Sequence, residues 1–261
     1  MALPYVTVQG VGSSPFLQPF GLLILLGLCG GGAAMALSAR RVNAKAGDAL
    51  AIAGISVAVA FVFAHIFDVA WYRLGHDEPV PLATWLKLFD GISLVGGIAG
   101  VAVVVIIWTK ARRLDTAVYA DLAAIGCVVA NTIGRIGCAL VHDHPGVRTE
   151  LPIGVDFPAM QAQWAGIRDI PADETVRLHD LGLEELVLMI PLTAIVFLLH
   201  RRGARPGLVA AVAAIGYACL RFPLDFLRVN EPVRLLTAGQ WGCVVMVLAA
   251  VLFGFVLRKP R

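Results

Sequence analysis

The chain has 261 residues, of which 59% are hydrophobic and 15% are charged, and its mean hydropathy is +0.81. Soluble domains carry about 25% charged residues, so this composition excludes an ordinary soluble protein and indicates an all-α, polytopic membrane protein. The net charge of +3 is too small to indicate a nucleic-acid partner.

Seven apolar segments each approach the roughly 20 residues that cross the hydrocarbon core of a bilayer. No tandem repeat, second domain or nucleotide-binding loop interrupts them, so residues 1–261 are expected to form one membrane-embedded domain. Gly30–Gly32 lies inside the first segment and indicates close helix packing. The predicted spans cover residues 16–38, 48–71, 91–108, 117–141, 181–199, 206–227 and 238–257.

Basic residues in the loops predict the orientation, because they collect on the cytoplasmic side. No charged residue precedes Arg40, whereas a secretory signal peptide begins with positive charge, so we expect a retained first span with its N-terminus outside. Seven basic residues lie in the loops of that side, and twelve lie on the other side, which places the C-terminus in the cytoplasm. The twelve are Arg40, Arg41, Lys45, Lys110, Arg112, Arg113, Arg201, Arg202, Arg205, Arg258, Lys259 and Arg261.

Residues 142–180 form a long loop on the predicted outer side. They contain four prolines, together with Gln161, Gln163 and Trp164, which is typical of an ordered segment. We therefore expect a small extracytoplasmic lobe within the single domain.

Charged residues inside the fourth span indicate a site, because a cation facing lipid costs several kcal/mol unless it is paired or meets water or a charged ligand. Arg135 lies near the outer end of this span, and Asp121 lies about four turns below it. Gly134 and Gly137 flank Arg135 and are expected to leave its sides bare, so that a bulky group can approach the guanidinium.

The sixth span carries a second set of polar side chains on one helix face. Tyr217, Arg221 and Asp225 are spaced i, i+4, i+8, and Arg228 follows three residues later. Asp225 can pair with Arg221 or Arg228, which leaves a positive surplus. One interpretation is that such charges only neutralise one another between helices and hold the bundle together. The other is a phosphate site, which in a membrane indicates a phospholipid head group, because guanidinium groups bind phosphate oxygens in pairs.

His142, Asp143, His144 and His179 offer either metal ligands or a general base. Side chains of adjacent residues point apart and rarely converge on one ion, and the five cysteines stand singly in apolar segments. We therefore expect no metal and no cofactor, and we assign a histidine here as a general base, since its pKa lies near physiological pH.

Six segments of the chain resemble segments of the prolipoprotein diacylglyceryl transferases of bacterial membranes and follow one another in the same order. The stretch Gly134-Arg135-Ile136-Gly137, with an acid eight residues after the arginine, is similar to the signature of that family. Asp121, in the same span, stands where that family has an aspartate. The other five similar segments are Phe20–Leu23 with Gly27, Gly96–Gly97, His179–Glu185, the set Tyr217, Arg221, Asp225 and Arg228, and Gly239–Gln240.

The resemblance implies an enzyme of the bacterial cytoplasmic (inner) membrane that acts at the outer face. It would transfer the diacylglyceryl group of phosphatidylglycerol to the lipobox cysteine thiol of a prolipoprotein signal peptide, releasing glycerol-1-phosphate. Arg135 and Arg221 would hold the phosphate and stabilise its growing charge. His142, Asp143 or His179 would remove the thiol proton. Further contacts to the lipid would come from Tyr217, Asp225, Arg228, Glu185 and Gln240.

The chain departs from the family pattern at several positions. Cys138 and Val141 replace two asparagines of the signature, and Val95 replaces a histidine of the third span. These replacements leave open a divergent relative that binds an anionic phospholipid and transfers to another acceptor, or is inactive. A transporter or channel would require inverted repeats or helices broken at mid-membrane, and neither is evident.

Overall fold

The computed structural model describes residues 3–7, 18–70, 80–87, 91–164, 166–167, 171, 173–229 and 235–258. Some sequence predictions lie outside these residues. They concern residues 16 and 17 of the first span, residue 71 of the second, parts of the predicted lobe, and the basic residues Arg73, Arg168, Arg234, Lys259 and Arg261.

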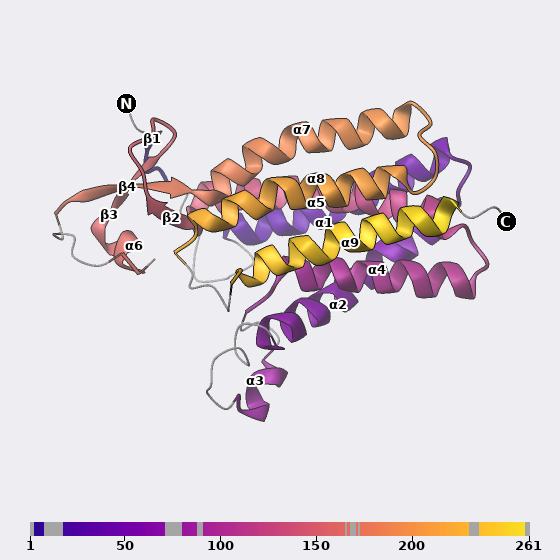
Figure 1. The fold of residues 1–261 in the computed structure, drawn as a ribbon, viewed down its shortest axis with the longest axis horizontal. Coiled ribbons are helices and arrows are strands. Elements are labelled where there is room, and N and C mark those ends of the chain that lie inside the picture. Colours follow the sequence, from indigo (N-terminus) through magenta and orange to yellow (C-terminus); the bar gives the residue numbers. More distant parts are fainter. Residues whose placement is uncertain are drawn as a thin grey trace.

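The described chain is a bundle of long apolar helices with a small sheet at one end (Figure 1). Six of these helices are long and apolar enough to cross a membrane, and the seventh, α9, has a shorter apolar helix over Ala238–Gly254. The prediction of a helical polytopic membrane protein is therefore confirmed, with six membrane-length helices in the described residues. The long helices are α1 Pro19–Arg41, α2 Ala46–Asp68, α4 Leu94–Ala111, α5 Thr116–Val141, α7 Leu181–Arg201, α8 Leu208–Leu224 and α9 Ala238–Arg258.

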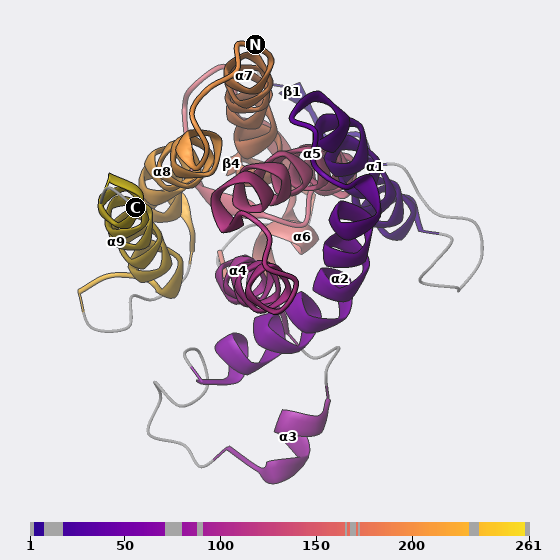
Figure 2. The same ribbon diagram turned by 90° about the vertical axis from the view of Figure 1, so that its right-hand side faces the viewer.

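Small residues let α5 pack closely against α1, since a glycine brings two backbones into contact. A Cβ atom added at Gly27 would lie 2.7 Å from the carbonyl oxygen of Ala130, and one at Gly31 would lie 2.6 Å from that of Gly126. The prediction that Gly30–Gly32 serves helix packing is confirmed. Figure 2 shows α5 in the middle of the bundle, and it contacts α1, α2, α4, α7 and α8.

Nine of the twelve predicted cytoplasmic basic residues, those at the ends of α1, α4 and α7 and in the turns that follow, lie at one end of the bundle. The C-terminal ends of α1, α4, α7 and α9 all lie at the end opposite the sheet (Figure 1). Three of the turns at that end contain a residue with positive φ: Asn43, Arg113 and Gly203. The alternation of helix directions therefore separates the basic loops from the end where α5 reaches the sheet.

Four strands and a short helix form the lobe. The strand order is β1-β3-β4-β2, with β1 parallel to β3 and the other pairs antiparallel. Phe157 and Leu178 are fully buried in its small core. The sequence indicated an ordered lobe. It did not indicate these strands, or that residues 3–4 would add a strand to the sheet. The elements are β1 Leu3–Pro4, β2 Pro145–Arg148, β3 Val155–Pro158, α6 Ala159–Trp164 and β4 Thr175–Asp180.

A short helix, α3 Leu82–Leu86, lies beside the end of α2 (Figure 1). The two ring nitrogens of the buried His65 on α2 face the carbonyl oxygens of Thr84 and Gly91, at 3.1 and 3.2 Å. His65, a polar residue inside a predicted span, therefore ties the α2–α4 connection to the bundle.

Candidate active site

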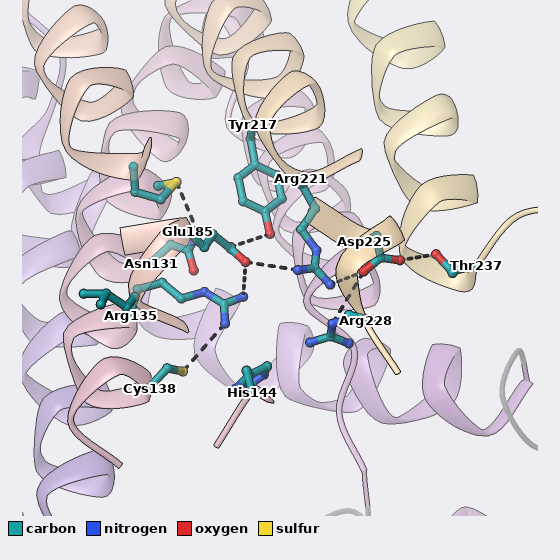
Figure 3. Close-up of polar contacts among 12 residues, drawn as sticks. Asn131, Arg135, Cys138, His144, Glu185, Tyr217, Arg221, Asp225, Arg228 and Thr237 are labelled. Carbon is teal, nitrogen blue, oxygen red and sulfur yellow. Dashed lines mark hydrogen bonds and ion pairs between the residues drawn. The ribbon is translucent and has the colours of Figure 1, made fainter. Parts of the chain in front are cut away.

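Glu185, in the first turns of α7, joins the two arginines that the sequence singled out. Its Oε2 atom lies 2.9 Å from Nη2 of Arg135 on α5 and 3.1 Å from Nη1 of Arg221 on α8 (Figure 3). The Tyr217 hydroxyl donates to Oε1 at 3.0 Å. Glu185 has no exposed surface, and Arg135 and Arg221 are each 8% exposed. Three helices thus meet at one buried carboxylate.

Asp225 extends this network beyond the end of α8. It begins a short 3-10 helix, Asp225–Leu227, and its Oδ1 atom lies 2.6 Å from Nη2 of Arg221. The same oxygen lies 3.5 Å from Nε of Arg228. The predicted pairing of Asp225 with an arginine of its own helix face is therefore confirmed, and both arginines take part.

Gln240 reaches this network through Thr237. The Thr237 hydroxyl donates to Oδ2 of Asp225 (Figure 3) and accepts the backbone N–H of Gln240 at 3.1 Å. Oε1 of Gln240 accepts the backbone N–H of Thr237 at 3.0 Å. This reciprocal pair is a capping box at the start of α9. The capping box fixes the position of the Thr237 hydroxyl, which donates a hydrogen bond to Asp225. Gln240 therefore acts on the cluster indirectly, through Thr237.

The cluster carries more positive than negative charge. Arg135, Arg221 and Arg228 bring three guanidinium groups, whereas Glu185 and Asp225 bring two carboxylates. Within the described residues, Nε of Arg135 is buried and has no hydrogen-bond partner. Pairing between helices is thus real, as one interpretation of the sequence required, but a positive surplus and an unused donor remain. Both features suit an anionic ligand.

Asp143 and His144 lie beside the Arg135 end of the cluster. Nη1 of Arg135 donates to the Sγ atom of Cys138 at 3.6 Å. One potential ligand atom from each of Cys138, Asp143 and His144 lies within 4.8 Å of the other two. Nδ1 of His144 is in contact with Oδ1 of Asp143. The expectation that neighbouring side chains point apart therefore does not hold for this pair.

His142 lies at the junction of the bundle and the lobe. Its backbone is left-handed, with φ 51°, and this turn ends α5. The ring stacks on Tyr5 with the centroids 4.7 Å apart, and Nδ1 contacts Asp180. The hydrogen bond to Asp180 raises the pKa of His142 above its ordinary value, against the opposing effect of burial. The structure thus engages His142 with the lobe rather than with the arginines.

Two further polar residues have local partners. Nδ1 of His179 lies 2.6 Å from Oε1 of Glu184 at the start of α7. Asp121 accepts the backbone N–H groups of Gly207 and Ala210 at 2.8 and 2.7 Å, so it caps the N-terminus of α8 instead of facing Arg135.

The glycines beside Arg135 serve packing. A Cβ atom at Gly134 would lie 3.2 Å from Ile24, and one at Gly137 would lie 3.2 Å from Phe20, both on α1. The expectation that these glycines leave the sides of Arg135 bare is therefore wrong, because residues of α1 pack against both of them. The guanidinium extends away from this contact toward α7 and α8 (Figure 3).

Residues 14–256 match the model of the prolipoprotein diacylglyceryl transferase family. The chain belongs to this family. A phosphatidylglycerol–prolipoprotein diacylglyceryl transferase of Cereibacter sphaeroides is 35% identical over 61% of this chain and 55% of its own length. Proteins of the same name from Bordetella bronchiseptica and Chlorobaculum tepidum are 30% and 27% identical, over 74% and 78% of this chain and over 71% and 72% of their own lengths. The match to the Cereibacter protein thus spans little more than half of that relative.

One residue of the network in this transferase-family chain, Thr237, escaped the sequence analysis. Thr237 was not considered, although the spacing Thr-x-x-Gln before an apolar run is a capping signal that could have pointed to it. His144 was considered beside His142, but only the left-handed turn at His142 decides which of the two faces the cluster.

Proposed function

We propose that this protein transfers the diacylglyceryl group of phosphatidylglycerol to the lipobox cysteine thiol of prolipoprotein signal peptides, with release of glycerol-1-phosphate. Family membership and the names of the relatives support this activity. One structural observation carries it for this chain. Arg135 and Arg221, from different helices, share a single carboxylate oxygen of Glu185.

The shared carboxylate gives the two guanidinium groups a fixed separation before any ligand binds. Two buried cations repel each other, and Glu185 offsets that repulsion by pairing with both. A lipid phosphodiester would then meet Arg135 and Arg221 already oriented, which lowers the ordering cost of binding. No described residue accepts a hydrogen bond from Nε of Arg135, so this donor can serve a phosphate oxygen.

The same arginines would lower the barrier of the transfer. As the bond between the glyceryl carbon and the phosphate oxygen breaks, negative charge grows on the departing phosphate. Preoriented donors stabilise such growing charge, and losing one donor typically costs about 100- to 1000-fold in rate. Tyr217 contributes by holding Oε1 of Glu185, so that Oε2 stays directed at the arginines.

We assign the removal of the acceptor thiol proton to Asp143 and His144. Of the predicted bases, Asp143 lies near Cys138, which Arg135 contacts. His142 and His179 are paired with Asp180 and Glu184. His144 orients Asp143 through their direct contact.

The orientation completes the proposal. The end of the bundle that carries the sheet, and with it the cluster, would face the outside of the bacterial inner membrane. The N-terminus would then be outside and the C-terminus, at the basic end, would be cytoplasmic.

The test is mass spectrometry of a lipobox peptide incubated with the purified full-length protein and phosphatidylglycerol. The wild type should add a diacylglyceryl mass to the cysteine, and R135A and R221A should each lower the initial rate at least about 100-fold. R112A is the matched control, since Arg112 also pairs with a helix carboxylate, Asp48, but at the basic end of the bundle. Transfer by R135A or R221A at the rate of R112A would contradict the proposal, provided that all variants elute as monodisperse protein.

A further inference from the structure

Cys138, Asp143 and His144 place sulfur, oxygen and nitrogen donors at one point next to Arg135. One donor atom of each residue lies within 4.8 Å of the other two. In a tetrahedral zinc site, bonds of about 2.0–2.3 Å put neighbouring donor atoms roughly 3.5 Å apart. Small side-chain rotations therefore bring these three donors onto a common centre.

Backbone hydrogen bonds tie the segment that carries the three residues to neighbouring elements. The N–H of His142 donates to the carbonyl of Cys138 at 2.8 Å, and the left-handed turn at His142 directs the chain back toward Cys138. The carbonyl of His144 accepts the N–H of Leu181 at 3.0 Å. Two residues after His144, Gly146 pairs with Arg228 in an isolated bridge. The donors therefore sit on a fixed turn between α5, α7 and the cluster.

Arg135 does not oppose a cation at this point. A thiolate and a carboxylate bring two negative charges, so a divalent ion bound by Cys138, Asp143 and a neutral His144 carries no net charge. The contact from Nη1 of Arg135 to Sγ of Cys138 then becomes a hydrogen bond to a coordinated sulfur, a common outer contact of metal ligands. Glu185 and Asp225 already pair with the nearby arginines and leave the three donors available.

We propose that Cys138, Asp143 and His144 bind one zinc ion beside Arg135. A cysteine, a histidine and a carboxylate are the donor types that zinc prefers, and three protein ligands leave a fourth position open. The side chains of Asp143 and His144 are 33% and 26% exposed, so an exogenous ligand can reach the open position.

The open position suits the acceptor thiol, a use that rests on the proposed function. A thiol that coordinates zinc loses its proton, here to water, and remains as a thiolate. Its sulfur attacks the terminal glyceryl carbon while the bond from that carbon to the phosphate oxygen breaks, and the oxygen leaves with the electron pair. The thioether product is a weaker ligand than a thiolate and departs. Without zinc, Asp143 and His144 would act as a simple base, so the two proposals are separable.

Metal binding is measured on the full-length protein in detergent, stripped with a chelator and then dialysed against Zn²⁺ or Co²⁺. We expect one Zn²⁺ per chain and, with Co²⁺, a sulfur-to-cobalt charge-transfer band. C138S should lose the band and weaken zinc binding at least tenfold, and H144A should weaken zinc binding similarly while keeping the sulfur band at high Co²⁺. C219S is the matched control, because Cys219 is an exposed single cysteine on α8.

Absence of stoichiometric zinc in the wild type would overturn the proposal, as would equal zinc affinity in C138S, H144A and C219S. Peptide lipidation is measured on the same samples. Transfer at the full rate by zinc-free protein overturns the role of zinc in activating the thiol but leaves the proposed transferase activity intact. Zinc binding that depends on Cys138 and His144 without any transfer supports the site and contradicts the proposed function.

Discussion

The hydroxyl of Thr237 donates to Asp225, which joins the first turn of α9 to the ion network at the end of α8. Asp225 in turn holds Arg221 at 2.6 Å. The start of α9, through its capping box, thus controls the position of an arginine on another helix.

Removing the Thr237 hydroxyl should therefore slow transfer without touching any group that would contact the lipid phosphate. In T237V the buried carboxylate of Asp225 loses a donor, which costs about 1–3 kcal/mol. We expect the transfer rate for the lipobox peptide to fall about 5- to 150-fold, the range this energy spans if it is lost in the transition state. T237S retains the hydroxyl and should recover most of the rate. Equal rates for T237V and T237S would mean that Thr237 serves only to start α9.

Glu185 should be indispensable for stability. In E185Q, Arg135 and Arg221 remain buried without their shared counter-charge, and breaking a buried pair in this way costs about 3–5 kcal/mol. The free energy of unfolding, measured by denaturant titration in mixed micelles, should drop by that amount. E174Q provides a control, because Glu174 is an exposed carboxylate of the lobe. A change in E185Q no larger than that of E174Q would show that the arginines do not need Glu185.

The α1–α5 contact should tolerate no side chain at Gly27. The added methyl group of G27A would lie 2.7 Å from the carbonyl oxygen of Ala130, so the helices must separate, at a cost of about 1–3 kcal/mol. G54A is a matched substitution inside α2 with no atom within 4 Å of the new methyl group. It should raise stability by about 0.5–1 kcal/mol, because alanine favours the helix. Thermal unfolding of both variants in detergent checks the pair, and equal melting temperatures would contradict the packing argument.

The junction between lobe and bundle should weaken as the pH rises. Asp180 raises the pKa of His142 in the folded protein above its ordinary value of 6.5. The resulting stabilisation is fully present below the unfolded-state pKa and is lost as the pH rises through the higher folded-state pKa. Hydrogen exchange of residues 3–7 and 142–148, corrected for intrinsic rates, should therefore show less protection above that pKa. H142Q should remove the pH dependence, and an unchanged profile in H142Q would assign it to another group.

The helices and one face of the site could be derived from the sequence because their causes are local. A backbone in hydrocarbon must satisfy its own hydrogen bonds, so each apolar segment of suitable length becomes a helix. The predicted 117–141 is α5, Thr116–Val141, almost unchanged. The spacing of Tyr217, Arg221 and Asp225 places them on one face through helix periodicity alone. The loop charges likewise separated the two ends of the bundle.

Only the tertiary structure decided which groups meet. Glu185 was one of several acids near a span end, and its shared role arises because α5, α7 and α8 converge on it. The lobe depends on strands far apart in the chain, with Leu3 beside Val155, and no local pattern specifies such pairing. The left-handed turn at His142 sends its ring toward Asp180 and brings Asp143 and His144 near Cys138. These relationships depend on long-range packing, whereas periodicity and hydropathy report only on each segment by itself.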